Sequence, residues 1–160
     1  MSRMYTVSFS ATVTNAGGDT DLFEVVPADD KPVRIRGLVL SQQEDTTEAN
    51  DYGLRISIIR LPATFTSGNG TSTTGQPLDD VDAAAGFAAE VNGTTVATTS
   101  GTAATLEEFG WIVRNTPLER WWPDERFAPM CRQAAGIVVR MQTTIPDDAT
   151  IQGTLYLEEL

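Results

Sequence analysis

Apolar and polar side chains alternate with a period of two along most of this chain, and this alternation limits the folds open to it. In the first stretch the apolar set is Tyr5, Val7, Phe9, Ala11 and Val13, with hydroxyl-bearing residues between its members. Successive side chains of a β-strand point to opposite faces, so this pattern predicts a strand with one buried face. The other segments with strand patterns are 21–26, 32–43, 53–62, 86–91, 94–99, 106–115, 136–143 and 150–159.

Eight or nine short strands and no convincing helical stripe predict an all-β fold. We expect an antiparallel two-sheet sandwich, and a jelly roll of about eight strands suits the count. The length of 160 residues is that of one domain, so residues 1–160 are expected to form a single jelly-roll domain. Two parts lack a strand pattern: a flexible N-terminal end before Tyr5, and a long Ser/Thr/Gly loop at 67–85. Asn92 and Gly93 predict a tight hairpin turn.

The charge balance and the missing residue types exclude several classes of function. Twenty-two acidic residues against eleven basic ones give a net charge of −11, which repels phosphate backbones, so we expect no nucleic-acid partner. No run of apolar residues is long enough to span a membrane, so we expect no membrane partner. The chain has no histidine and a single cysteine, Cys131, which excludes Ser-His and Cys-His nucleophile pairs and nearly all zinc sites. We therefore expect neither an enzyme nor a bound cofactor, and no metal site apart from the calcium question at Asp79, Asp80 and Asp82.

Two groups of carboxylates are candidates for metal binding or for catalysis. Asp79, Asp80 and Asp82 lie in the predicted loop and supply part of a calcium shell, but the spaced pattern of a calcium loop is absent. Calcium binding and a solvated turn both remain open for this group. Glu107 and Glu108 are adjacent on a predicted strand, so they point to opposite faces and cannot flank one glycosidic bond.

The segment "RWWPDERFAP", residues 120–129, carries two adjacent tryptophans between arginines and prolines. In extended chain the rings of Trp121 and Trp122 diverge, so we expect one to pack inward and one outward. Arg126 can stack on an aromatic ring, and rigid aromatic segments with arginines are typical of interface hot spots. Three interpretations remain: a cover over the core, a subunit or capsid interface, and a platform for a glycan.

Two predicted strands place apolar side chains on the face that carries polar ones. Leu38 and Leu40 follow Arg34 and Arg36 on one strand, and Ile59 and Leu61 follow Arg55 and Ser57 on the other. Either these four apolar side chains form a subunit contact, or a β-bulge, for example at Gly37, turns them inward. Both interpretations stay open at this point.

Six blocks of sequence, taken in order, resemble a family of small proteins encoded beside the major capsid gene of tailed bacteriophages. The blocks are "DDKPVRIRGLVLSQ", "DYGLRISIIRLPATFTSGNG", "TTVATTSGT", "WWPDERFAP", "GIVVRM" and "PDDATIQGTLYLEE". The resemblance implies a jelly-roll head decoration, or cement, protein that binds the outside of the capsid. It implies a homotrimer as the self-association state and the major capsid protein as the partner.

The implied role is structural: a virion protein, made in the host cytoplasm, that reinforces the shell as a trimeric clamp between capsomers. A clamp of three weakly binding feet gains strength through effective concentration. The candidate interface residues are Trp121, Trp122, Arg126, Leu38, Leu40, Ile59 and Leu61. The alternative function is a carbohydrate-binding, lectin-like β-sandwich of a phage or cell surface that uses Trp121 or Trp122.

Overall fold

The computed structural model describes residues 2–14, 18–43, 53–112, 117–142 and 145–160, and every regular element in these ranges is a β-strand. The described part has no helix that is long and apolar enough to cross a membrane. Met1 and the end of the strand predicted at 106–115 lie outside the described residues, as does residue 143. The strands are β1 Arg3–Val13, β2 Thr20–Val26, β3 Val33–Gln42, β4 Gly53–Leu61, β5 Phe65–Thr66, β6 Thr71–Thr73, β7 Gln76–Pro77, β8 Ala88–Gly93, β9 Thr98–Thr99, β10 Ala104–Ile112, β11 Leu118–Trp121, β12 Met130–Cys131, β13 Gly136–Met141 and β14 Ala149–Glu159.

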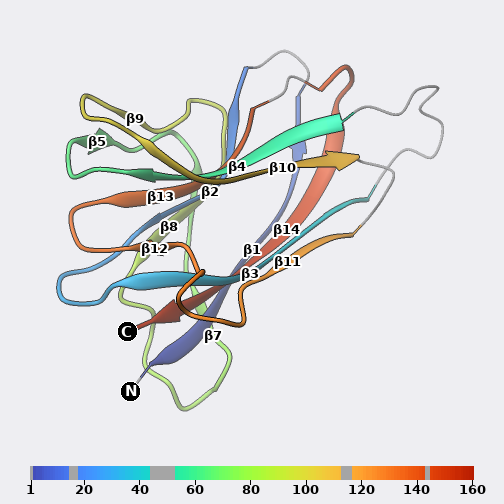
Figure 1. Cartoon of the computed structure of the whole chain (residues 1–160). Helices are drawn as coiled ribbons and strands as arrows, with labels where there is room; N and C mark the ends of the chain where they lie inside the picture. Colours follow the sequence, from blue (N-terminus) through green and yellow to red (C-terminus); the bar gives the residue numbers. More distant parts are fainter. Residues whose placement is uncertain (1, 15–17, 44–52, 113–116, 143–144) are drawn as a thin grey trace.

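Eight of these strands form one long antiparallel ribbon that is rolled up on itself. The ribbon pairs β1 with β14, β2 with β13, β3 with β11 and β4 with β10, so that each pair is nested inside the previous one. Rolling brings β14 beside β3 and β13 beside β4. The result is the strand arrangement of a jelly roll, and the predicted fold class is confirmed. Because β1 and β14 pair along their whole length, the two chain ends lie side by side (Figure 1).

The rolled ribbon makes two sheets that pack face to face around the core. The first sheet has the order β11-β3-β14-β1-β7, with β12 also paired to β3, and the second has the order β10-β4-β13-β2-β8-β6. The alternating apolar positions of both sheets meet between them, as the period of two requires. The largest fully buried side chains are Tyr5, Leu22, Phe23, Ile35, Leu38, Leu40, Leu54, Ile56, Ile58, Leu61, Ile137 and Met141.

The segment between β4 and β10, residues 62–103, is an insertion at the tip of the ribbon, and it folds back over the sandwich. It adds β8 beside β2, β6 beside β8, and β7 beside β1. Its two remaining strands, β5 and β9, pair with each other as a small third sheet (Figure 1). The insertion therefore extends both sheets and covers part of the outer face of the second one.

Three buried carboxylates hold the insertion by accepting backbone N–H groups from it. Asp21 accepts from Ala97 at 2.7 Å, Glu24 accepts from Gly68 at 3.0 Å, and Glu159 accepts from Gly86 at 2.7 Å. All three carboxylates are at least 95% buried. A buried carboxylate is costly unless it is hydrogen-bonded, so each of these contacts fixes the insertion in one position.

Asp21 also forms a buried ion pair beneath the insertion. The guanidinium of Arg140 donates to it from Nε at 2.6 Å and from Nη2 at 3.0 Å, and Nη2 also donates to the Ala97 carbonyl at 2.7 Å. Burial raises the pKa of Asp21, while Arg140 and the Ala97 N–H act in the opposite direction. One residue pair thus connects β2, β13 and the insertion.

Three local expectations differ from the structure. The range 67–85 is not one continuous loop, because β6 and β7 within it pair with β8 and β1. At the N-terminal end Arg3 and Met4 already belong to β1, where they pair with β14. Asn92 and Gly93 do not form a hairpin turn: both belong to β8, and Asn92 has φ 53°, a left-handed conformation that asparagine tolerates.

Candidate interaction surface

The two adjacent tryptophans point in opposite directions, as the alternation predicts. Trp122 is 5% exposed and belongs to the core cluster, whereas Trp121 is 49% exposed. The Trp122 Nε1–H donates to Glu107 Oε2 at 2.9 Å, and the Arg120 guanidinium lies 5.7 Å from the centre of the Trp122 ring. Arg120 also forms an ion pair with Glu107. Trp122 therefore closes the core where the edge strands β10 and β11 meet.

Trp121 lies on the outer face of the first sheet and covers a glycine. It is paired with Gly37 across β11 and β3, and Gly37 is paired with Tyr156 across β3 and β14. A side chain on Gly37 would overlap the Trp121 ring, so the ring lies directly over the glycine and reaches Tyr156, with ring centres 4.8 Å apart. Aromatic side chains commonly cover glycines in sheets in this way.

The four apolar residues predicted as a possible subunit contact are buried within this chain. A register shift between β3 and β14 leaves Arg36 without a partner next to Gly37, and this bulge turns Leu38 and Leu40 inward, where both are 0% exposed. The second of the two interpretations therefore holds for β3.

On β4 neither interpretation holds, because the insertion supplies the cover. Ile59 and Leu61 point away from the main core, yet they are only 5% and 2% exposed. They form a second apolar cluster with Val138, Ala97 and Phe65, of which the last two belong to the insertion. The exposed members of the predicted interface set are thus Trp121 and Arg126.

Arg126 is held beside an exposed aromatic residue that the sequence did not single out. Its guanidinium pairs with Asp124 at 2.7 Å and lies 6.0 Å from the centre of the Phe127 ring. Arg126 lowers the pKa of Asp124. Phe127 is 75% exposed, although a phenylalanine is usually buried. A large exposed aromatic side chain on a segment that is held by an ion pair is typical of a binding surface.

Phe127 and Arg126 line a hollow of about 480 Å³, which we call the basic hollow. Its walls come from β3, β4, β10 and the segment that leads into β12. The lining residues are Arg34, Arg60, Leu106, Glu107, Glu125, Arg126, Phe127, Ala128, Pro129 and Met130. Three arginines and two glutamates line it, and two of the arginines pair with carboxylates: Arg34 with Glu125 and Glu158, and Arg126 with Asp124.

The arginines of the basic hollow are incompletely paired. Arg34 Nη1 donates to Glu125 and to Glu158, both at 3.0 Å, but Arg34 Nε is buried and has no hydrogen-bond partner within the described ranges. Arg60 donates to the Met130 carbonyl at 3.4 Å, which is a long hydrogen bond. Arg60 is exposed and pairs with no carboxylate among the described residues, so a carboxylate that reached the hollow would be stabilised beside it.

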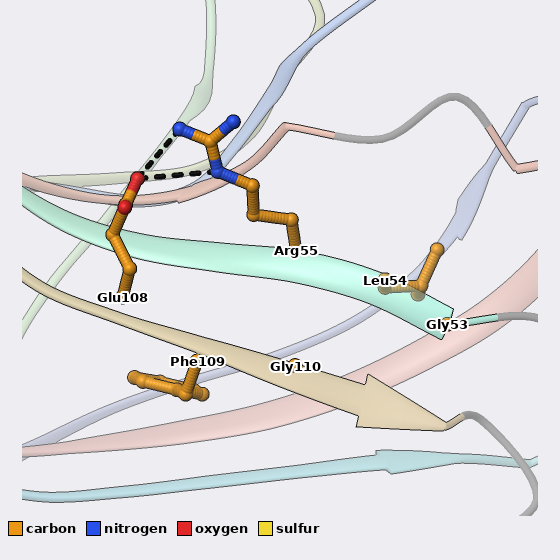
Figure 2. A pocket seen from close by; sticks show the side chains of 6 residues that line it. All are labelled: Gly53, Leu54, Arg55, Glu108, Phe109 and Gly110. Atoms are coloured by element: carbon orange, nitrogen blue, oxygen red, sulfur yellow. Dashed lines mark hydrogen bonds and ion pairs between the residues drawn. The ribbon is translucent and has the colours of Figure 1, made fainter.

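A second pocket, of about 460 Å³, lies on β4 and β10 and is lined by Gly53, Leu54, Arg55, Glu108, Phe109 and Gly110 (Figure 2). Arg55 Nη2 donates to Glu108 Oε1 at 2.6 Å. This hydrogen bond and one from Ser57 lower the pKa of Glu108, which favours the ionised carboxylate. Glu107 on the same strand faces Arg120 and Trp122 instead, so the two adjacent glutamates point to different faces as predicted.

The remaining candidates for chemistry are occupied by structural contacts. Cys131 is fully buried, and burial raises the pKa of its thiol to about 11, so the thiolate nucleophile is not formed near neutral pH. Asp79 Oδ1 accepts the N–H of Val81 at 3.2 Å, and Asp82 forms an ion pair with Arg3 at 3.3 Å. Among the described residues no group of three or more metal-ligating side chains comes together.

No protein-family model matches the chain, and no curated protein matches it. Among solved structures, the chain is similar to a chain of the infectious bursal disease virus Gx strain at 13% identity and a TM-score of 0.20, covering 99% of this chain and 42% of that one. A VP2 subviral particle of infectious bursal disease virus gives 13% identity, a TM-score of 0.21 and the same coverage. This chain therefore spans less than half the length of these neighbours, and TM-scores this low support no inference about its function.

Proposed function

We propose that this chain is a non-catalytic structural protein of a tailed-phage virion that binds the outside of the capsid and reinforces it as a trimeric clamp between capsomers. The proposal extends the resemblance of the six sequence blocks. The observation that carries it is the basic hollow, because exposed Phe127 and partly exposed Leu106 line it and make it a surface for contact with another protein of the assembly. Exposed aromatic side chains next to arginines are the usual composition of protein-binding hot spots.

The rolled ribbon suits a load-bearing role. The two ends of the chain are joined along β1 and β14, and the insertion is fixed to both sheets, so force applied at one edge reaches the other through backbone hydrogen bonds. A shell under internal pressure separates along the contacts between capsomers. A rigid body that binds both sides of such a contact opposes this separation. Several weak binding sites on one body together give a high overall affinity.

The test is binding to empty heads assembled from the major capsid protein that the proposal names as the partner. We expect the purified protein to sediment with these heads and to raise the temperature at which they come apart. Phe127→Ser should weaken binding at least tenfold, whereas Ile112→Ser, which changes a 43% exposed residue on β10, should not. Failure of the wild-type protein to sediment with heads at about 10 µM, roughly a −7 kcal/mol interaction, would overturn the proposal.

One observation favours glycan binding as the second candidate function. The Trp121 ring lies over Gly37 on the outer face of the sheet beside Tyr156, and half of it is exposed. Glu119 accepts from Trp121 Nε1 at 3.3 Å, and Arg36 and Glu158 lie on the same face, where they supply donors and acceptors for hydroxyl groups. A sugar that stacks on this ring would change its fluorescence, so titration of oligosaccharides with Trp121→Phe as the control tests this function.

A further inference from the structure

A short exposed segment combines apolar and acidic side chains at the edge of the first sheet. We call it the acidic tip: Leu78, Asp79, Asp80, Val81 and Asp82, which directly follow β7. Leu78 is 58% exposed and Val81 is 83% exposed, the highest value among the large apolar residues of the described chain. Because two exposed apolar side chains lie among three carboxylates, we expect the surface that binds this segment to be both apolar and basic.

The acidic tip is held in one conformation by contacts with the sandwich. The Leu78 N–H donates to the Met4 carbonyl at 2.9 Å, and the Asp82 N–H donates to the Asp79 carbonyl at 3.1 Å. Just beyond the tip, the Tyr5 hydroxyl donates to the Ala83 carbonyl at 2.9 Å. A segment that is already ordered loses little conformational entropy when it binds, so such a tip is a favourable ligand for a preformed hollow.

The basic hollow and the acidic tip lie at the two ends of one row across the first sheet. Met130 of the hollow pairs with Arg34, Arg34 pairs with Glu158, and Glu158 pairs with Met4, whose carbonyl accepts the Leu78 N–H. The row crosses four strand spacings, or about 19 Å at about 4.8 Å each. Within one chain the tip therefore cannot reach the hollow, whereas the hollow of a second copy can receive it.

We propose that the acidic tip of one copy docks into the basic hollow of the next copy. Asp80 then pairs with Arg60, and Val81 packs against Phe127. The contact joins two different surfaces of identical chains, so it runs head to tail and closes into a ring when the rotation between copies is a simple fraction of a turn. This inference names the contact through which the copies in the proposed function associate. The number of three copies rests on that proposed function.

Charge reversal in solution, without heads, tests the contact. We expect the wild-type protein at about 10 µM to have the mass of a multimer by light scattering. Asp80→Arg and Arg60→Glu should each shift the mass to that of one chain, because each places like charges together, and the double variant should regain the multimer. Asp147→Arg makes the same charge change at an exposed residue outside both surfaces and should keep the wild-type mass.

Four outcomes overturn the inference: a single-chain mass for the wild-type protein, an unchanged mass for either single reversal, loss of the multimer in Asp147→Arg, or no recovery in the folded double variant. The outcomes also separate this inference from the proposed function. If the wild-type protein is a single chain and Arg60→Glu loses binding to heads, the hollow receives the shell and not a second copy. If the masses behave as expected and nothing binds heads, the contact between copies stands and the capsid role fails.

Discussion

At the scale of single residues, Gly37 is the position where one methyl group should have the largest effect on the candidate surface. A Cβ there would overlap carbons Cε3 and Cζ3 of the Trp121 ring. We expect Gly37→Ala to push this ring off Tyr156 and to lower the free energy of unfolding by about 1–3 kcal/mol, the usual cost of overpacking. Tryptophan emission would shift to longer wavelength, and urea unfolding would measure the loss.

The matched control for this variant is Gly110→Ala on β10. A Cβ at Gly110 would meet no atom within 4 Å, and no glycine of the described chain has a positive φ. We therefore expect this second variant to unfold like the wild-type protein or to gain up to about 1 kcal/mol from a less flexible unfolded chain. Equal losses in the two alanine variants would show that the tryptophan contact has no special weight.

Cys131 gives a prediction about alkaline pH. Burial raises the pKa of its thiol from 9.0 to about 11, so the unfolded chain loses this proton at lower pH than the folded chain. The stabilisation from the neutral thiol is complete below about pH 9 and is lost as the pH rises toward about 11, by up to about 1.4 kcal/mol per pH unit. The difference in unfolding free energy between the wild-type protein and Cys131→Ala should shrink between about pH 9 and about pH 11. A constant difference would contradict the prediction.

At the scale of elements, the insertion depends on buried carboxylates that contact its backbone. Glu24 accepts from Ser67 Oγ at 2.5 Å and from Gly68 N–H at 3.0 Å. Glu24→Ala leaves both donors without this acceptor, so hydrogen exchange of the Gly68 amide should become at least tenfold faster, while amides in the centre of β14 keep their protection.

Glu90→Ala is the control for the Glu24 variant. Glu90 is paired with Glu24 across β8 and β2, and its Oε2 atom has no hydrogen-bond partner among the described residues. Glu90 belongs to the insertion, but its removal takes no acceptor from the Ser67 and Gly68 donors, so exchange at Gly68 should stay as in the wild-type protein. Faster exchange in both variants would mean that general loosening of the edge strands, and not the loss of one acceptor, releases the insertion.

The sequence predicts the elements of the ribbon well and those of the insertion poorly, for one physical reason. Long strands such as β1 and β14 bury one face, so their alternation is visible in the residues themselves. The short strands β5, β6, β7 and β9 are strands because of the partners they meet, which lie far away in sequence. Asn92 and Gly93 show the same limit, since local turn propensity is overruled there by pairing with β2.

At the scale of the whole molecule, the sequence predicts those features of the candidate surface that arise from residues adjacent in the chain, and not those that arise from distant residues. The opposite directions of Trp121 and Trp122 follow from strand geometry. The basic hollow does not, because Arg34, Arg60 and Arg126 come together only after the ribbon has rolled up. The sequence also does not show that the insertion covers Ile59. An apolar residue on the outer face of a strand therefore looks like part of an oligomer interface when only the sequence is known.

The rolled-up molecule also predicts how strongly the assembly binds a shell. Several feet on one rigid body bind about 10²–10⁴ times more tightly than one foot, provided that all of them engage together. A chain that stays single, such as Arg60→Glu under the proposed contact, should therefore need at least about 100-fold more protein for half-saturation of capsid heads. The double variant Asp80→Arg, Arg60→Glu should return to the wild-type value, because it restores the ring without restoring either residue. Binding isotherms by quantitative sedimentation measure both, and a double variant that binds as weakly as Arg60→Glu would show that this arginine contacts the shell itself.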